Sequence, residues 1–434
     1  WLMHLNSRLL FCKDGFIVLF KTIISYTLKV STYFKKENDP LASLSTHFPY
    51  GSFNKHPTIL QVIPALKSGG VEIETLEVAS AILAAGGRPI IACAQGELSK
   101  DPRTKGVLLK ILPLNTKNPL QIWRNAKLLK ELIRNEKVDI VHARSRGPAW
   151  SAFKAAKEAN SPFITTYHAA YKSRSFFKTL YNSVMAAGDR VIAISPFIKR
   201  HIKAKYNRSR WFDSSKLRLI PRGIDLAYFN PKSISVEQVT HLREEWALPP
   251  KARVILLPGR LSKSKGQDTL IKAFSLMKSP NTFLILLGSA QGHETYRDTL
   301  LNLATSLNLK DRVKWFPAIS DLAPAYQLAD VIVCPSHVPE GFGRLIVEAQ
   351  AMEKPIIATN HGGVCDLIEE GKTGWLVPPQ DEKSLAKVLD QVLTLPKKEL
   401  VAMGKQERAW AETHFSKIAM LSKTIAVYKE VISD

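Results

Sequence analysis

The sequence has few cysteines and none of the spacings that bind zinc or form redox pairs. Its 434 residues include four cysteines, Cys12, Cys93, Cys334 and Cys365, with no Cys-x-x-Cys motif and no Cys/His cluster. Cys93 and Cys334 lie in apolar runs typical of strands, so we expect them to be buried free thiols. A protein without predicted disulfides suits a reducing compartment, and we expect it in the cytoplasm.

Long uncharged apolar runs are also missing near the start of the chain. Residues 9–30 are apolar overall but contain three lysines and one aspartate, and their longest uncharged stretch is residues 22–28. This stretch is far shorter than a membrane span, and the small-residue cleavage pattern of a signal peptide is absent. We expect residues 1–56 to be an N-terminal extension. It is either an interfacial amphipathic helix or, as we prefer, poorly ordered sequence before the first domain.

Acidic residues are in deficit. The chain has 61 lysines and arginines against 38 aspartates and glutamates, a formal net charge of +23. Such a charge favours nucleic acid, an anionic membrane surface or an acidic substrate as partner. No zinc-finger, RNP or helix-turn-helix motif is present, so nucleic acid is not expected. The most basic stretch, residues 199–222, is either a solvated helix face and loop or a surface for anionic lipid, where each basic residue contributes about 1 kcal/mol.

Short apolar strands and helical segments alternate from residue 58 onward. This alternation predicts parallel sheets covered by helices on both faces. The strands expected in the first half are 58–63, 89–93, 138–141, 163–166, 190–194 and 217–220. Those expected in the second half are 254–257, 282–287, 313–316, 331–333, 355–358 and 375–377.

A proline-containing break near residues 233–251 divides this series in two. The predicted fold class is therefore α/β, with two Rossmann-like domains that face each other across a cleft. We place the first domain at residues 57–235 and the second at residues 251–410. The tail beyond them, residues 411–434, is predicted to be helical.

The most informative segment of the chain runs from Glu340 to Glu348, with the sequence Glu-Gly-Phe-Gly-Arg-Leu-Ile-Val-Glu. A buried strand is predicted before it and a helix over residues 344–352. Two carboxylates and a Gly-x-Gly turn thus lie where the carboxyl end of a strand meets a helix N-terminus. Open α/β sheets bind ligands there, and free backbone N–H groups favour phosphate. Because carboxylates accept hydrogen bonds from sugar hydroxyls, a sugar joined to a diphosphate would use both features.

A second motif, Gly-Arg-Leu-Ser-Lys-Ser-Lys-Gly, follows the first strand after the break. Gly259 next to the strand end lets a ligand approach the backbone, while Arg260 and Lys265 supply positive charge. Charge-assisted hydrogen bonds to a diphosphate are the natural use of these side chains. The same charges would stabilise a departing nucleotide diphosphate.

Taken together, Glu-x7-Glu with Gly-Phe-Gly inside it and Gly-Arg-x4-Lys-Gly resemble the motifs of the family 4 retaining glycosyltransferases, which have the GT-B fold. The resemblance covers residues 58 to about 433. It implies that Arg260 and Lys265 bind the donor diphosphate, that Glu348 binds the ribose, and that Glu340 contacts hydroxyls of the donor sugar. It also implies that the C-terminal helix crosses back onto the first domain.

The same resemblance assigns further residues to the site. His168, after strand 163–166, would lie beside the reacting sugar, so the expected catalytic residues are His168, Arg260, Lys265 and Glu340. The segment at the end of strand 313–316 would line the nucleobase side. The wider donor set is Gly69, Gly70, Gly259, Phe316, Pro317, Gly341, Phe342 and Gly343.

One local stretch, His142-Ala-Arg-Ser-Arg-Gly-Pro-Ala-Trp150, resembles proteobacterial glycosyltransferases of lipopolysaccharide core assembly, including core mannosyltransferases. Arg144 and Arg146 could bind a phosphorylated or carboxylated glycolipid acceptor, or could simply be exposed arginines on a loop. One departure from the family pattern is Asp366, which stands where the family has Glu after Gly-Gly-x-x. Its side chain is one methylene shorter, which puts that contact in doubt.

The sequence therefore predicts a hexosyltransferase that moves a hexose from a nucleotide-diphosphate sugar to a glycolipid acceptor. GDP-mannose is the favoured donor on the resemblance near Arg144, and UDP-sugars are the alternative. No cofactor and no metal ion are expected, since no Asp-x-Asp motif occurs in a suitable loop and two cations serve the diphosphate. The rival hypotheses are a GT-B nucleotide-sugar epimerase or hydrolase, and a basic membrane- or RNA-binding protein on an inactive scaffold. The expected location is the cytoplasm, including the inner face of the cytoplasmic membrane.

Overall fold

The computed structural model describes residues 52–433 apart from 68, 172–174 and 291. Residues 1–51 lie outside the described part of the chain. The expectations for Cys12 and for the N-terminal extension up to residue 51 therefore stay predictions. Among the described residues, Cys93 and Cys334 are buried free thiols, as predicted. No helix in this part of the chain has the length and apolarity needed to cross a bilayer.

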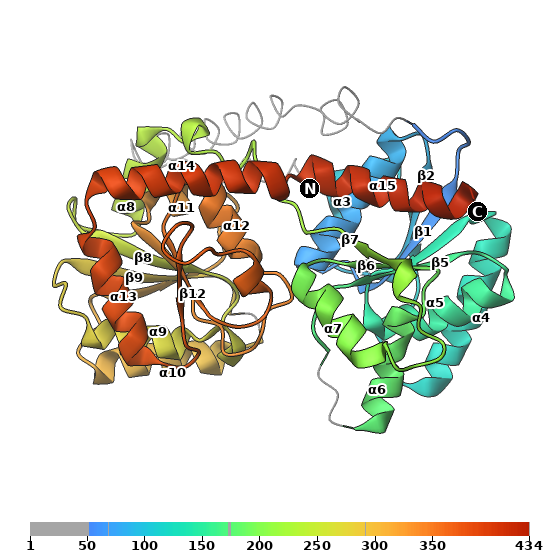
Figure 1. Cartoon of the computed structure of the whole chain (residues 1–434), viewed down its shortest axis with the longest axis horizontal. Coiled ribbons are helices and arrows are strands. Elements are labelled where there is room, and N and C mark those ends of the chain that lie inside the picture. Colours follow the sequence, from blue (N-terminus) through green and yellow to red (C-terminus); the bar gives the residue numbers. More distant parts are fainter. Residues whose placement is uncertain (1–51, 68, 172–174, 291, 434) are drawn as a thin grey trace, which may run out of the picture. The chain divides into compact units, whose positions relative to one another are not determined.

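The first domain is built on a seven-stranded parallel sheet (Figure 1). Its strand order is β3-β2-β1-β4-β5-β6-β7, so the order reverses between β1 and β4. The strands are β1 (Thr58–Ala65), β2 (Arg88–Ala94), β3 (Leu108–Ile111), β4 (Ile140–Ala143), β5 (Phe163–Tyr167), β6 (Arg190–Ala193) and β7 (Leu217–Leu219).

The second domain repeats this plan with six parallel strands in the order β10-β9-β8-β11-β12-β13. Here the order reverses between β8 and β11. The strands are β8 (Arg253–Pro258), β9 (Thr282–Leu287), β10 (Val313–Phe316), β11 (Val331–Cys334), β12 (Ile356–Thr359) and β13 (Trp375–Val377). The predicted α/β class with two Rossmann-like sheets is confirmed.

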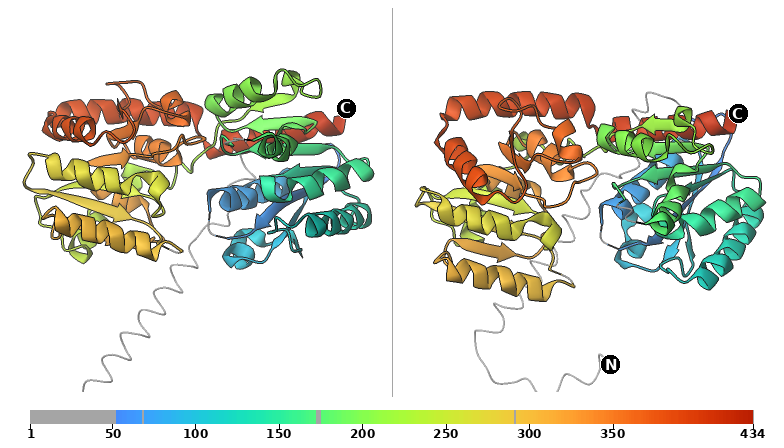
Figure 2. Two further views of the ribbon diagram at one scale, coloured as in Figure 1. Left: turned by 90° about the horizontal axis from the view of Figure 1, so that it is seen from below. Right: turned by 60° about the horizontal axis from the view of Figure 1, so that its bottom comes forward.

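Helices cover both faces of each sheet (Figure 2). The helices of the first half are α3 (Gly70–Ala84), α4 (Pro119–Asn135), α5 (Arg146–Glu158), α6 (Phe176–Ser183), α7 (Pro196–Tyr206) and α8 (Val236–Glu245). Those of the second half are α9 (Gln267–Leu276), α10 (Glu294–Ser306), α11 (Ala323–Leu328), α12 (Arg344–Ala351), α13 (Glu382–Thr394), α14 (Lys397–His414) and α15 (Lys417–Ser433). Helix α8 packs on α11 and so joins the second domain.

Two differences from the sequence-based prediction concern strands of the first sheet. The prediction missed β3, an edge strand whose side chains are only partly buried and which includes Lys110. The strand predicted at residues 138–141 begins two residues later, as β4, so Arg146 starts helix α5 instead of lying on a loop.

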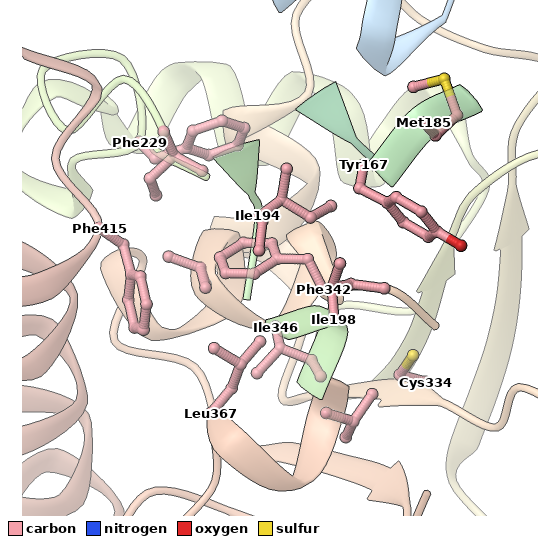
Figure 3. Packing of buried hydrophobic residues seen from close by; sticks show 14 of the residues in the cluster. Tyr167, Met185, Ile194, Ile198, Phe229, Cys334, Phe342, Ile346, Leu367 and Phe415 are labelled. Carbon is pink, nitrogen blue, oxygen red and sulfur yellow. The ribbon is translucent and has the colours of Figure 1, made fainter. Parts of the chain in front are cut away.

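A continuous apolar cluster links the strand ends of the two domains. Figure 3 shows the ring of Phe342 lying among Ile194, Ile198 and Ile346. Phe342 also meets Phe415 edge to face, with ring centroids 5.6 Å apart. The side chain of Phe342 therefore packs in the core, and only its backbone can face a ligand.

The chain crosses between the domains twice at neighbouring positions. Ile224 N–H donates to the Phe415 carbonyl at 2.8 Å, and Lys417 N–H donates to the Ile224 carbonyl at 3.0 Å. Lys417 Nζ also pairs with Asp225 at 2.5 Å. After this crossing α15 packs on α3 and β4 of the first domain, whereas α14 packs on α12 of the second (Figure 1).

Helix α15 is anchored by Tyr428, which is fully buried. Its hydroxyl lies 2.7 Å from Nδ1 of His142 on β4, and the Nε2 of that ring lies 2.8 Å from the Thr166 hydroxyl. The returning helix thus completes a buried hydrogen-bond chain in the first domain.

We predict that Tyr428→Phe lowers the free energy of unfolding by about 1–3 kcal/mol, because it leaves the buried Nδ1 of His142 without its partner. Urea denaturation followed by circular dichroism measures the change. Lys423→Ala, an exposed position on the same helix, is the matched control and should stay within about 0.5 kcal/mol of the parent. Equal midpoints for Tyr428→Phe and the parent would contradict the anchoring role.

Candidate active site

The loops after β8 and β11 bring Lys265 and Glu340 together at the switch point of the second sheet. Lys265 ends a short 3-10 turn, Lys263–Lys265, and its Nζ donates to Oε1 of Glu340 at 2.8 Å. The Ser336 hydroxyl donates to the same oxygen at 2.5 Å. Because parallel strands present their carboxyl ends at one edge, residues 75 positions apart meet here.

Both members of this pair are held in their charged forms. Burial alone would raise the pKa of Glu340, but the charge of Lys265 and the hydrogen bonds from Lys265 and Ser336 lower it overall. Burial would likewise lower the pKa of Lys265, but the charge of Glu340 outweighs it and raises that pKa. An ionised carboxylate can accept hydrogen bonds only, which suits sugar hydroxyls as donors.

The Gly-x-Gly turn after Glu340 requires its glycines. A Cβ on Gly341 would lie 2.5 Å from the carbonyl oxygen of His168, so this loop touches the end of β5 in the first domain. Gly343 has φ of +103°, a conformation that side-chain-bearing residues rarely adopt, and it is the residue immediately before α12. The turn therefore packs against the backbone of His168 and leads directly into α12, whose first turn favours an anionic group.

Glu348 lies in α12, one helical turn after Arg344. Its Oε1 accepts a hydrogen bond from Arg344 Nε at 2.7 Å, and its Oε2 accepts one from the Tyr326 hydroxyl at 2.7 Å. The carboxylate is almost completely buried. Since an ionised carboxylate offers about four lone-pair positions, two bonds fix its orientation and leave acceptor capacity for a ligand.

Other predicted donor residues lie at neighbouring strand ends. Arg260 is exposed, and Gly259 has open space where a Cβ would be, so a ligand can approach this backbone. Phe316 ends β10, but its ring stacks on Trp246 with centroids 4.7 Å apart, so one face is already occupied. Pro317 is exposed. Their contact with a nucleobase stays a prediction.

The first domain has a buried charge cluster around Glu74 of α3. Arg144, directly after β4, pairs with Oε1 of Glu74, and Arg222 Nε lies 2.8 Å from Oε2. Burial raises the pKa of this carboxyl, but the two arginines outweigh it and lower the pKa to about 2. Arg222 Nη2 also donates to the Gly70 carbonyl at 2.5 Å. The cluster therefore holds the Gly69–Gly70 turn in place.

The two arginines predicted to bind an acceptor have different surroundings. Arg144 is only 1% exposed and is committed to Glu74, so the alternative of an exposed loop arginine is wrong for it. Arg146, at the start of α5, donates to Asn182 at 2.7 Å and lies over the ring of Tyr171 at 4.6 Å. Arg144 is thus held in the interior by its ion pair with Glu74. Acceptor binding by Arg146 stays a prediction.

His168 lies where the two domains meet. Within the described part of the chain, neither of its buried ring nitrogens has a hydrogen-bond partner. Burial lowers its pKa to about 3, with Arg144 and Arg222 acting in the same direction and Glu74 opposing them. The ring is therefore neutral near pH 7, with one donor and one acceptor nitrogen to offer a ligand.

Asp366 and the basic stretch make contacts between the domains. The carboxylate of Asp366 accepts from the Phe197 N–H at 2.6 Å and from Arg200 at 2.7 Å, and so caps α7. Its shorter side chain thus serves a contact with the first domain. Further along the stretch, Arg218 pairs with Glu430 on α15, so several basic residues at 199–222 are engaged within the protein.

Three residues of this site were missed by sequence reasoning. Ser336 and Tyr326 carry no motif of their own, and only their spatial positions reveal them. Glu74 did leave a signal, because it lies one helical turn before the buried Val78 on α3. A carboxylate on the buried side of a helix predicts a cationic partner.

These arrangements suit one kind of ligand. Near the second switch point, Arg260 and Lys265 could bind a diphosphate, and Glu340 and Glu348 could accept hydrogen bonds from hydroxyls. In the described ranges, His, Cys, Asp and Glu form no group of three or more that could hold a metal ion.

Two family models match the chain. The model described as Glycosyl transferases group 1 matches residues 238–410, and the model described as Glycosyltransferase Family 4 matches residues 68–228. The first range includes Lys265, Glu340 and Glu348. The second includes His168 and Glu74.

Solved structures and curated relatives agree with these models. A glycosyltransferase from Rickettsia africae ESF-5 is 36% identical, with a TM-score of 0.81 over 88% of this chain and 100% of that one. HepE of Anabaena, solved with UDP and glucose, is 22% identical, with a TM-score of 0.75 over 86% and 98% of the two chains, and shows the fold alone. A D-inositol 3-phosphate glycosyltransferase of Kineococcus radiotolerans is 31% identical over 268 residues, which are 58% of this chain and 59% of that relative's length.

We predict that His168 makes the stability of the protein pH-dependent. The folded ring has a pKa of about 3 against 6.5 in the unfolded chain, so the unfolded state binds the proton first as the pH falls. Stability is then lost between pH 6.5 and 3, by at most about 1.4 kcal/mol per pH unit. Replacing the ring by His168→Gln should flatten this loss in urea denaturation between pH 7 and 5. Above pH 7.5 the free energies of unfolding of the parent and of His168→Gln should change with pH in parallel. Parallel curves at every pH would contradict the prediction.

Proposed function

Because the chain belongs to the GT-B glycosyltransferases, we propose that it moves a hexose from a nucleotide-diphosphate sugar onto a glycolipid acceptor, with retention of the anomeric configuration. The donor would bind at the switch point of the second domain and the acceptor on the first. The reaction would take place in the cytoplasm, at the inner face of the membrane that holds the acceptor.

The observation that carries this proposal is the Lys265–Glu340 pair beside the start of α12. The cation and the helix start favour a diphosphate, and the carboxylate, which its partners keep ionised, favours a hydroxyl-rich group. Glu348, eight residues further on, adds a second oriented carboxylate. In this proposal Glu348 binds the ribose and Glu340 the transferred sugar, so the nucleotide sugar lies along one edge of the sheet.

The proposed chemistry needs charge stabilisation on the leaving group. The bond between the anomeric carbon and the diphosphate oxygen breaks, and the acceptor oxygen attacks from the same face. The acceptor proton passes to the departing diphosphate. Arg260 and Lys265 would stabilise the charge that develops there, a contribution that does not depend on a divalent ion. Neutral His168 would donate or accept one hydrogen bond at the reacting sugar or acceptor.

Two donors are the first to test. The resemblance of the stretch around Arg144 to core mannosyltransferases favours GDP-mannose and a lipopolysaccharide core acceptor. HepE, which shares the fold, was solved with UDP and glucose, which supports UDP-glucose as the second choice.

Nucleotide binding is tested by thermal shift of the purified chain with GDP, UDP, ADP and their common sugars. A ligand that binds only the folded state raises the melting temperature. We expect one nucleotide series to do so, and Lys265→Ala to weaken its binding about 10- to 100-fold, as expected when a charged hydrogen bond is lost.

Lys263→Ala is the matched control, because Lys263 is an exposed lysine in the same loop and should leave binding intact. Stabilisation by UDP compounds only would discard mannose while keeping the fold and the chemistry. No shift with any nucleotide would reject the donor site and revive a binding protein on an inactive scaffold.

The reaction itself is tested by product analysis with and without an added glycolipid acceptor, in the presence of EDTA. We predict a glycolipid product with the donor's anomeric configuration in its NMR spectrum, and loss of at least 100-fold in rate for Glu340→Gln. Release of free sugar at the same rate without acceptor would favour a hydrolase, and a rearranged nucleotide sugar would favour an epimerase. Loss of activity in EDTA would overturn the metal-independent mechanism.

A further inference from the structure

Helix α6 exposes large apolar side chains to solvent. Phe176 is 77% and Phe177 79% exposed, and Leu180 on the next turn is exposed as well. The two phenylalanine rings meet edge to face, with centroids 6.0 Å apart. Exposed aromatic residues gathered in this way mark a surface that meets another apolar phase.

An apolar groove of about 560 Å³ lies between α4, α5 and α6, and Tyr181 of α6, the residue after Leu180, is part of its lining. Trp123 of α4 and Trp150 of α5 line it together with Tyr181 of α6. The Trp150 indole N–H donates to the Tyr181 carbonyl at 2.9 Å, which ties α6 to the groove. Leu120 on α4 is exposed beside it. We call the surface formed by helices α4, α5 and α6 the α4–α6 face. The three helices lie near one another in Figure 1.

The α4–α6 face is basic as well as apolar. Its three helices contain eight basic residues, Arg124, Lys127, Lys130, Arg134, Arg146, Lys154, Lys157 and Lys178, against two acidic ones, Glu131 and Glu158. Lys127 Nζ lies 3.8 Å above the centre of the Trp123 ring. Amphipathic aromatic rings beside lysines suit the boundary between lipid headgroups and acyl chains.

We propose that the α4–α6 face docks the protein on an anionic lipid bilayer, with Phe176, Phe177 and Leu180 inserted among the lipids and the lysines paired with headgroups. The charge of the face selects this occupant, since two copies of one basic surface repel each other whereas an anionic bilayer attracts both. The inference rests on the proposed function and deepens it, since it names the surface by which the protein would reach the membrane that holds the acceptor.

The test is co-sedimentation of the full chain with vesicles of phosphatidylcholine and phosphatidylglycerol. We expect binding to these vesicles, and weaker binding to pure phosphatidylcholine. Phe176→Ser/Phe177→Ser should weaken binding by about tenfold or more, because two rings can no longer enter the bilayer. Lys127→Glu/Lys157→Glu should weaken it as well, and added salt should reduce the difference from the parent.

Matched controls lie on α14 of the second domain. Val401→Ser/Trp410→Ser removes two exposed apolar side chains there, and Lys397→Glu/Lys398→Glu makes the same change in net charge. Both should bind vesicles like the parent. The nucleotide thermal shift of every variant should also match the parent, which separates this proposal from that of the donor site.

Three results would overturn the inference. The parent chain could fail to sediment with anionic vesicles, the Phe176→Ser/Phe177→Ser variant could bind as well as the parent, or the α14 controls could lose as much binding as the α6 variant. Concentration-dependent dimers in sedimentation velocity that only the α6 substitutions abolish, without vesicle binding, would assign the face to a second copy instead.

Discussion

Burying a carboxylate costs several kcal/mol unless cations and hydrogen bonds offset the loss of water, and Glu74 meets that condition with two arginines. One arginine follows β4, and the other follows β7 and also holds the carbonyl of Gly70. The glycine turn after β1, the end of β4 and the segment leading to the second domain are therefore positioned by one charge. His168 lies next to this cluster, and burial keeps its ring neutral although Glu74 favours the charged form. The geometry of the first half of the site thus rests on an interaction between residues that no ligand needs to touch.

Much of the fold could be predicted because parallel strands that are covered on both faces leave a strong mark in the sequence. Strands β9 and β13 lie at the residues expected for them, since each is a short apolar run between breaks. Strand β3 escaped because an edge strand needs little burial, and its Lys110 interrupts the pattern. Hydrophobic periodicity does not predict the order of strands in a sheet. That order places the ends of β8 and β11, which carry the candidate donor site, side by side.

The motif residues of the candidate site could be found from the sequence because a loop and the following helix start carry them within a few positions. Their supports could not. The partner of Arg144 is 70 residues away, and the stack of Phe316 on Trp246 joins two segments with no common motif. Burial decides what such side chains can do, and burial depends on the packed structure. Arg144 is an example. It follows a strand end and was considered for acceptor binding, but in the packed structure it pairs with the buried Glu74.

The bond between Tyr428 and His142 joins residues 286 positions apart, and this has a consequence for the order in which the protein can form. A nascent chain grows from its N-terminus, and domains tend to fold as units while synthesis continues. Here the sheet of the first domain emerges early, but its last helix is encoded at the very end of the described chain. The second domain, complete in sequence before α15, can finish first. The first domain must therefore wait, with His142 and the surface that α15 covers still open, until α15 has left the ribosome.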